Sequence, residues 1–537
     1  MPHLVRNLTV RVGCAAIVLA TASWFIWGSD PGMESAHGVA TGERRSAAAE
    51  QRLLRPLTHR VVPVVNRQTW PTAGTVHGLE QKEVALANHL EQRAHGALLD
   101  HPGDVGAILD LGRRLLWLGN WIRAEELANA ALAIAEGDPF ALGLLSAVRY
   151  EQGRAAEGLR LAQSALATSD RVPLALLGRA RATAARGDLT AAIAELEHAA
   201  SLDSDEPLIA FALACVLVDA SRFAVARSWL QRSLAFVIDE QGKRPYLETN
   251  LAIAQMLGER EPLACKLAPE GTLLPLQLLP LPAVRCTLRG RGKQLDGLVV
   301  LDCGASNTIL GPMAAELAHA TDGTAWMSGV AGTSPIGSGI LDHLVLGDLD
   351  ISNVPALLDR TQVAAHAPGV LATIGTATLR HFTVTIDTAR ETCRFQSLAT
   401  PSARRGNGAT IPFQLCSNQL LVPAHFQGST PRTFLFDTGA SAVFVSTRVL
   451  VEEFGQLAGR AGTQVSISGE ESRTIEVAPP RPLVFGGLPM LLPTIVGDPT
   501  VESRNQRAHL ETAGTIGLVL RARYEIDFAR QLLHLSQ

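Results

Sequence analysis

Along residues 112–233, small residues recur every 34 residues between larger apolar ones, and turn-forming residues recur with the same period. The turn formers are Gly119, Gly153 and Gly187, followed by Ser221, and Pro139, Pro173 and Pro207. The small residues form three columns: Ala124, Gly158, Ala192 and Ala226; Ala131, Ala165, Ala199 and Ser233; and Gly112, Ser146, Ala180 and Ala214. Small side chains let paired helices approach closely, and large ones such as Leu115 and Leu142 fill the layers. The pattern predicts three or four helix pairs stacked in a solenoid.

This period of 34 residues, with small residues at the helix crossings and Pro between units, resembles the tetratricopeptide repeat (TPR). We assign residues 79–262 to the repeats, with one further helix near 80–100 and a capping helix at Tyr246–Leu257. The resemblance implies a concave groove for a peptide or a protein partner. A spacer that orients the rest of the chain is the alternative.

Two apolar runs in the second half of the chain read as buried strands that end on an aspartate. Phe434-Leu435-Phe436 runs into Asp437-Thr438-Gly439-Ala440-Ser441. Leu298-Val299-Val300-Leu301 runs into Asp302-Cys303-Gly304-Ala305-Ser306, 135 residues earlier. Each run predicts a strand followed by a turn with a carboxylate at its tip.

The surroundings of the two aspartates are also duplicated. The ordered matches are Leu344–Gly347 through Pro355 with Leu483–Gly486 through Pro493, Thr373-Ile374-Gly375 with Thr515-Ile516-Gly517, and Ile386-Asp387-Thr388-Ala389-Arg390 with Ile526-Asp527-Phe528-Ala529-Arg530. Such a series indicates a tandem duplication.

Each copy resembles a retropepsin-like aspartic peptidase domain, in which an apolar pair and a Gly pack under the catalytic turn. The expected fold is therefore multidomain: an all-α helical-repeat solenoid followed by two all-β barrels, residues 272–398 and 408–537. The resemblance implies an aspartic endopeptidase with Asp302 and Asp437 as its catalytic pair. One carboxylate takes a proton from a water, and the other carboxyl group binds the scissile carbonyl. Pairing within one chain is preferred over a homodimer that joins two copies of Asp437.

The loop residues around the aspartates carry further expectations from the family. Gly304 and Gly439 let the backbone turn beneath each carboxylate, and Thr438 reaches across to the backbone of the opposite loop. Cys303 replaces that threonine in the first copy; a thiol is a weaker donor than a hydroxyl, so half of the brace is loosened. It also places an oxidisable group beside the site. At positions 305 and 440 the chain has Ala, as retropepsin-like sequences do, where pepsin-like enzymes have a hydroxyl that binds the carboxylate. Loss of this hydrogen bond to the anion raises the carboxyl pKa, which predicts an optimum for cleavage at about pH 5 to 6.

The family closes its cleft with glycine-bearing hairpin flaps. The candidates are Trp326–Leu346, with Gly329 and Gly332, and Gln464–Val477, with Gly469 near its tip. Ordinary exposed hairpins are the alternative.

Residues 1–28 have an export pattern, in which Arg6 and Arg11 precede an apolar run from Val12 to Gly28. A cleaved signal peptide and a retained inner-membrane anchor both fit this pattern. Residues 29–78 read as a linker. The expected location is the periplasm or the cell envelope.

Composition narrows the remaining possibilities. The net charge of −4 and the lack of a basic patch interleaved with aromatics give no support to nucleic-acid binding. No spacing of Cys or His suggests a metal, and no cofactor is implied. Cys286 and Cys393, near opposite ends of the first copy, are either a disulfide or two buried thiols. The alternative function is a non-catalytic envelope scaffold with degenerate peptidase domains, to which Cys303 lends support.

Overall fold

The structure, a computed structural model, describes most of the chain from residue 103 onward. The described residues are 103–236, 243–279, 281–328, 333–359, 369–400, 408–416, 418–440, 442–455, 460–465, 471–477, 481–492, 494–498, 501, 505, 512–519 and 521–536. Of residues 322–335 and 460–477 only the backbone is described. The predicted export segment, the linker and the helix near 80–100 lie outside the described residues.

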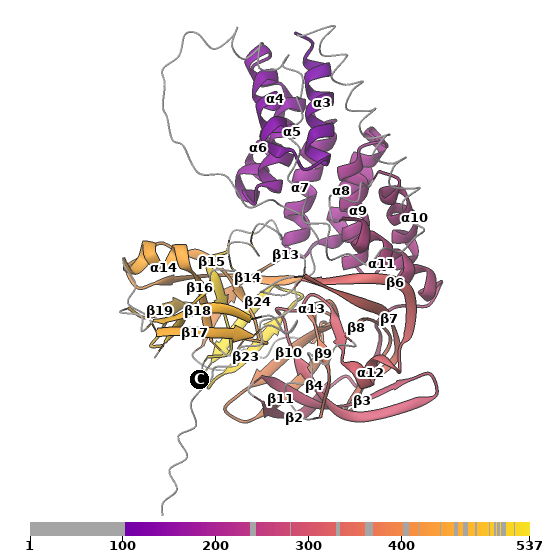
Figure 1. Ribbon diagram of the computed structural model, residues 1–537, viewed down its shortest axis with the longest axis vertical. Coiled ribbons are helices and arrows are strands. Elements are labelled where there is room, and N and C mark those ends of the chain that lie inside the picture. The colour runs from indigo at the N-terminus through magenta and orange to yellow at the C-terminus, as the bar shows by residue number, and fades with distance from the viewer. Residues whose placement is uncertain are drawn as a thin grey trace, which may run out of the picture.

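The helical part consists, in its described residues, of four consecutive helix pairs and a capping helix, α11 (Lys243–Leu257). The pairs are α3 (Val105–Trp117) with α4 (Trp121–Ile134), α5 (Pro139–Glu151) with α6 (Ala155–Thr168), α7 (Pro173–Ala185) with α8 (Leu189–Leu202), and α9 (Pro207–Asp219) with α10 (Phe223–Leu234). These helices stack into one solenoid with a continuous apolar core (Figure 1). The predicted solenoid is confirmed.

The 34-residue period has a direct geometric cause. Gly119, Gly153 and Gly187 stand just beyond the first helix of each pair with φ of 79°, 78° and 81°, and Ser221 takes the same left-handed conformation with φ of 57°. Glycine ends helices in this way because it has no Cβ to clash. Each periodic proline opens the next pair as the first helical residue, where its missing N–H costs no hydrogen bond.

The columns of small residues lie where helices cross. A Cβ added to Gly158 of α6 would stand 2.9 Å from the Ser146 carbonyl oxygen of α5, and one added to Gly178 of α7 would stand 2.5 Å from Ser146 Oγ. Ser146 Oγ itself donates a hydrogen bond to the Gly158 carbonyl at 2.7 Å. Larger side chains at these positions would force the helices apart.

The first β domain contains a closed barrel. Its strands pair in the ring order β3 (Pro282–Gly290), β4 (Lys293–Leu301), β9 (Val370–Ile374), β5 (Thr308–Leu310), β8 (Leu349–Leu358) and β7 (Thr333–Leu346), and β7 returns to pair with β3. The short strand β1 (Ala264–Lys266) adds to β8, and β6 (His319–Ser328) forms a hairpin with β7. The short helices α12 (Pro312–Ala315) and α13 (Thr376–Leu379) complete the domain.

The second β domain repeats this order as a half-barrel. The equivalent path is β14 (Gln419–Phe426), β15 (Arg432–Phe436), β22 (Gly514–Ile516), β16 (Val443–Ser446), β21 (Ile495–Asp498), β18 (Glu471–Val477) and β17 (Arg460–Val465). Where the first copy has the single long strand β7, this copy has β18 and a separate strand, β19 (Leu483–Phe485). Of these two strands, β19 pairs with β14 and β18 pairs with β21, so the ring is interrupted among the described residues. β13 (Gln414–Cys416) and β20 (Leu488–Met490) flank the path.

The two copies share a sheet. Its order is β12 (Ala409–Pro412), β24 (Leu532–Ser536), β23 (Arg523–Asp527), β10 (Phe382–Asp387), β11 (Thr392–Ser397) and β2 (Thr272–Leu278). β10 and β23 pair antiparallel at its centre, with Thr385 opposite Glu525. Equivalent strands of the copies therefore meet at the centre of the sheet.

The repeated Ile-Asp-x-Ala-Arg motif ends these two central strands. Asp387 Oδ1 accepts hydrogen bonds from the backbone N–H groups of Ala389 and Arg390, and the Arg390 guanidinium binds Asp387 Oδ2 at 3.2 Å. Asp527 binds the backbone and the guanidinium of Arg530 in the same manner, at 3.0 and 2.7 Å. The motif is a turn closed by an aspartate and clamped by an arginine.

The solenoid rests on both β domains, with its C-terminal end against β6 and β7 (Figure 1). Asn353 Nδ2 donates to the Glu261 carbonyl at 2.9 Å, which joins the first domain to the segment after α11. Gln531 Nε2 of the second domain donates to the Ala185 carbonyl of α7 at 3.4 Å. Both copies are thus tied to one helical body.

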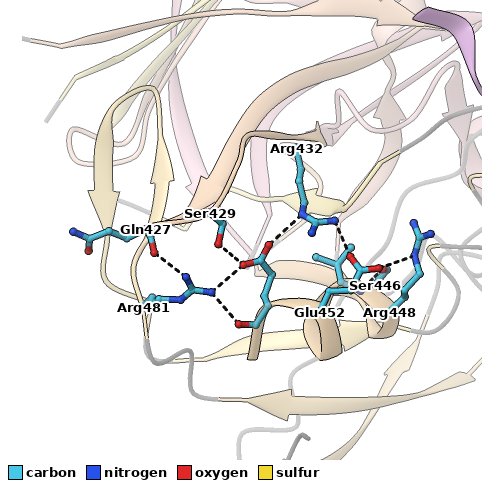
Figure 2. A network of polar contacts seen from close by, with 9 residues as sticks. Gln427, Ser429, Arg432, Ser446, Arg448, Glu452 and Arg481 are labelled. Carbon is cyan, nitrogen blue, oxygen red and sulfur yellow. Dashed lines mark hydrogen bonds and ion pairs between the residues drawn. The ribbon is translucent and has the colours of Figure 1, made fainter. Parts of the chain in front are cut away.

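A polar network fixes α14 (Thr447–Phe454) to the second domain (Figure 2). Glu453 receives Arg432 at 3.2 Å and Arg481 at 2.9 Å, and Arg432 also reaches Glu452 at 3.0 Å. The Ser429 hydroxyl binds Glu453 as well. The helix is therefore held to the β14–β15 turn and to the start of β19 by one buried carboxylate.

Two further expectations meet the structure here. Cys286 and Cys393 are both buried free thiols, so a disulfide between them is not formed. Among the described residues no helix is long and apolar enough to cross a membrane; the candidate anchor lies outside those residues.

Candidate functional site

The two Asp-x-Gly turns sit at matching places in their domains. Asp302 follows β4, and its backbone N–H donates to the Ile374 carbonyl of β9 at 3.1 Å. Asp437 follows β15, and its backbone N–H donates to the Ile516 carbonyl of β22 at 3.0 Å. In each copy an apolar strand delivers the aspartate beside the Thr-Ile-Gly strand of the duplicated pattern.

Both carboxyl groups are buried and held by backbone amides. Asp302 Oδ1 accepts from the N–H groups of Gly304 and Ala305, each at 2.9 Å. Asp437 Oδ1 accepts from Gly439 N–H at 2.7 Å. The exposed fractions are 0% for Asp302 and 2% for Asp437. Asp302 Oδ2 is buried and has no hydrogen-bond partner among the described residues.

A reciprocal set of hydrogen bonds joins the two loops. The Thr438 hydroxyl accepts from Cys303 N–H at 2.9 Å and donates to the Leu301 carbonyl at 2.8 Å. The Cys303 thiol accepts from Thr438 N–H at 3.2 Å and donates to the Phe436 carbonyl at 3.4 Å. Cys303 therefore makes the same two contacts as Thr438, with the longer, weaker bonds of sulfur. The loops face each other within one chain.

A glycine lies under each loop at a distance that admits no side chain. A Cβ added to Gly375 would stand 2.3 Å from the Asn307 carbonyl oxygen, and one added to Gly517 would stand 2.1 Å from the Ala440 carbonyl oxygen. Thr376, which our sequence analysis missed, donates its hydroxyl to the Cys303 carbonyl at 2.8 Å. Its position directly after the duplicated Thr-Ile-Gly was the available signal.

The environment shifts the titration of the pair. Burial raises the pKa of Asp302 well above its usual range, and the negative charge of Asp437 raises it further. The N–H groups of Ala305 and Gly304 oppose the shift. Neighbouring carboxyl groups of this kind retain one proton between them and titrate as a unit.

Cys303 is poorly suited to the oxidation switch suggested by its sequence position. The residue is 0% exposed, and burial, together with the nearby Asp437, raises the pKa of its thiol. The reactive thiolate is therefore disfavoured. Its visible role is to hold the opposite loop.

The two candidate flaps are hairpins in the described backbone. β6 and β7 pair antiparallel from Ser328–Thr333 to His319–Ile340, and β17 and β18 pair from Val465–Glu471 to Arg460–Glu476. Gly329, Gly332 and Gly469 lie outside the described residues. Each copy therefore contributes one buried aspartate and one hairpin.

No family model matches the chain, and no curated protein matches it. Among solved structures, it is similar to a thermophilic TPR protein of Thermus thermophilus, with 24% identity over 33% of this chain and 100% of that chain, at a TM-score of 0.24. It is also similar to YrrB, described as a TPR protein with an unusual peptide-binding site, with 14% identity over 31% and 85% at a TM-score of 0.21. For pilF of Pseudomonas aeruginosa the identity is 17% over 33% and 82%, at a TM-score of 0.22. The helical part is a repeat solenoid that resembles the tetratricopeptide repeat, as its own 34-residue period and helix pairing indicate.

Proposed function

We propose that the chain is an aspartic endopeptidase of the retropepsin-like kind, with Asp302 and Asp437 as one intramolecular catalytic pair. The observation that carries the proposal is the reciprocal brace between Cys303 and Thr438, which holds two buried aspartate loops against each other. Burying two carboxyl groups at one site costs stability. Such a costly arrangement is typical of a functional site.

In this mechanism the ionised member of the pair takes a proton from a water placed between the carboxyl groups. The resulting hydroxide adds to the scissile carbonyl carbon, while the protonated member hydrogen-bonds the carbonyl oxygen and stabilises the charge that develops there. Collapse of the tetrahedral intermediate breaks the C–N bond, and the amine leaves with a proton returned by the pair. The products are one carboxylic acid and one amine, so the atoms of water are fully accounted for.

The solenoid is assigned to recruit the protein substrate or a partner. Its support is structural: a helical-repeat surface that rests on both β domains brings any polypeptide it binds close to the carboxyl pair.

The test follows cleavage of an unfolded protein across pH 3 to 8 by the purified chain and its Asp302→Asn and Asp437→Asn variants. Asp296→Asn, on an exposed carboxylate of β4 that accepts from Gln294, is the matched control. We expect both loop variants to lose at least a thousandfold in kcat/KM and the control to keep its activity. Thermal unfolding verifies that all variants are folded.

Other outcomes would overturn this assignment in distinct ways. Loss of activity in Asp437→Asn alone would mean that the second copy works as a homodimer. If neither the parent chain nor Cys303→Thr cleaved any substrate, the non-catalytic scaffold would be favoured.

A further inference from the structure

A cavity of about 170 Å³ lies where the solenoid meets the first β domain. Its helical wall comes mainly from the first helices of the second, third and fourth pairs and from α11. Tyr150, Arg181, Phe211 and Tyr246 contribute from α5, α7, α9 and α11. Its opposite wall includes Ser306 and Asn307, four and five residues beyond Asp302 in the same loop. The cavity therefore joins the helical repeats directly to the catalytic loop.

The cavity lies close to the carboxyl pair, because Asn307 in its wall is only five residues beyond Asp302. Five residues of extended chain span at most about 17 Å, so the cavity lies within about five residues of a substrate's scissile bond. A substrate that continues past the catalytic loop on this side meets the helical wall.

The lining is mostly apolar with a few polar groups available to a ligand. Leu357 and Leu415 from the β domains face Phe211 and Val216 from α9 across the cavity. Asn307 makes no side-chain hydrogen bond with the described residues, and it is half-buried at the edge of the loop. The amide of Asn307 can therefore pair with the main chain of a peptide, while the apolar wall takes a side chain.

A polar relay fixes the shape of the cavity from all three parts of the protein. Arg380 of the first β domain donates to Asn418 Oδ1 at 2.8 Å, and Asn418 Nδ2 of the second domain donates to Asp219 Oδ1 of α9 at 3.0 Å. The Arg380 guanidinium makes no other hydrogen bond with the described residues, so further N–H groups remain for a ligand carbonyl. All three residues line the cavity.

Other contacts fill a different stretch of the helical surface. Trp117 of α3 packs edge-on against Phe211 with ring centroids 6.3 Å apart, and its indole N–H donates to the Phe236 carbonyl at 2.8 Å. The Lys243 ammonium lies 3.7 Å from the centroid of the same indole. The solenoid's own side chains occupy this stretch, and the cavity beside the catalytic loop is the space that they leave.

We propose that this cavity is a remote substrate subsite, built jointly by the repeats and the catalytic loop, which selects a large apolar side chain three to five residues from the scissile bond. The inference rests on the proposed peptidase function. It gives the solenoid a specific role, because the repeats then select substrates by one side chain in addition to recruiting them.

The test uses Ala184→Trp, which fills the cavity from α7, and Ala182→Trp as its matched control. Both alanines are half-buried on the same helix, but only Ala184 lines the cavity. Peptides of ten residues with a central scissile bond carry Leu, Phe or Asp at one position three to five residues from that bond, and short peptides have two residues on each side of it. We expect the parent and Ala182→Trp to prefer Leu or Phe over Asp at least tenfold in kcat/KM at one of these positions. Ala184→Trp should lose that preference and cleave the short peptides within twofold of the parent.

Binding separates this inference from the peptidase proposal. Fluorescence anisotropy of a labelled ten-residue peptide with a non-hydrolysable central bond reports the subsite even if no cleavage occurs. Binding that Ala184→Trp weakens at least tenfold, and that Ala182→Trp leaves unchanged, supports the subsite on its own. Equal binding and equal preference in all three proteins would overturn it. So would a photo-crosslinker at residue 184 that captures residues 1–102 of the chain instead of the peptide.

Discussion

The Thr438 hydroxyl and the Cys303 thiol occupy equivalent positions in the two loops, and each binds the main chain of the other loop. The symmetry is chemical as well as positional, since both groups accept one N–H and donate to one carbonyl. A cysteine at this place therefore keeps the brace complete, at sulfur's longer distances.

Removing the thiol should destabilise the paired domains. In Cys303→Ala the Thr438 N–H and the Phe436 carbonyl lose their buried partner, which should cost about 1–3 kcal/mol in the free energy of unfolding. Cys303→Thr should unfold within about 1 kcal/mol of the parent and cleave at least as fast. Urea unfolding measures the first effect and kcat the second.

Cys393→Ala is the control for loss of a buried thiol alone, because Cys393 is 0% exposed and makes no side-chain hydrogen bond within the described residues. If Cys303→Ala were no less stable than Cys393→Ala, the brace would contribute nothing.

Cleavage should have a bell-shaped pH profile with its maximum at about pH 5 to 6. Below the lower apparent pKa both carboxyl groups are protonated and no base remains; above the upper one both are ionised and no acid remains. The raised pKa of Asp302 places the alkaline limb above the usual carboxyl range.

Ala305→Ser offers a second check on that profile. A hydroxyl that donates to the Asp302 carboxylate would favour the anion, so the profile should move to lower pH by about half a unit to one unit. A parent maximum below about pH 3 would contradict the assignment, and an unmoved profile in Ala305→Ser would contradict its explanation.

Glu206 should make the solenoid less stable as pH rises from 4.5 to 7. Burial raises the pKa of Glu206 from 4.5 to about 7, although Arg113, 3.6 Å away, lowers it in part. The folded form thus binds this proton more tightly than the unfolded chain, so the contribution of Glu206 to stability is fully present below pH 4.5 and is lost as the pH rises through 7.

Glu206→Gln lacks this titration, so the unfolding free energy of the parent minus that of the variant should decline between pH 4.5 and 7. Lys243 has its pKa lowered to about 7 by burial and titrates over a higher window, from about 7 to 10.5, so its effect is common to both proteins and cancels. Identical pH slopes for parent and Glu206→Gln between pH 4.5 and 7 would refute the assignment.

The sequence predicts the repeated parts well because each repetition reports one geometric requirement. The period of Gly119, Gly153 and Gly187 marks left-handed turns, and Gly375 and Gly517 mark a contact too close for a Cβ. These constraints act locally, so they are readable without tertiary structure.

Contacts between residues far apart in the chain have no such signal in the sequence. The docking of Asn418 against Asp219, across 199 residues, follows from three domains packing together, and no periodicity records it. The cavity beside Asn307 likewise exists only after docking. The interruption of the ring in the second copy does have a signal in the sequence. Pro479 and Pro480 stand between β18 and β19, and proline has no N–H to donate to a strand ladder.

The relay from Arg380 through Asn418 to Asp219 also limits how the protein can move. A two-lobed enzyme can admit a long polymer by swinging its halves apart, but here the helical body is tied to both halves, and they share a central sheet as well. Any swing would break these ties together. For the peptidase proposed above, entry and exit of a long substrate would then depend on the two hairpins, which makes hairpin opening the step to examine as the limit on turnover.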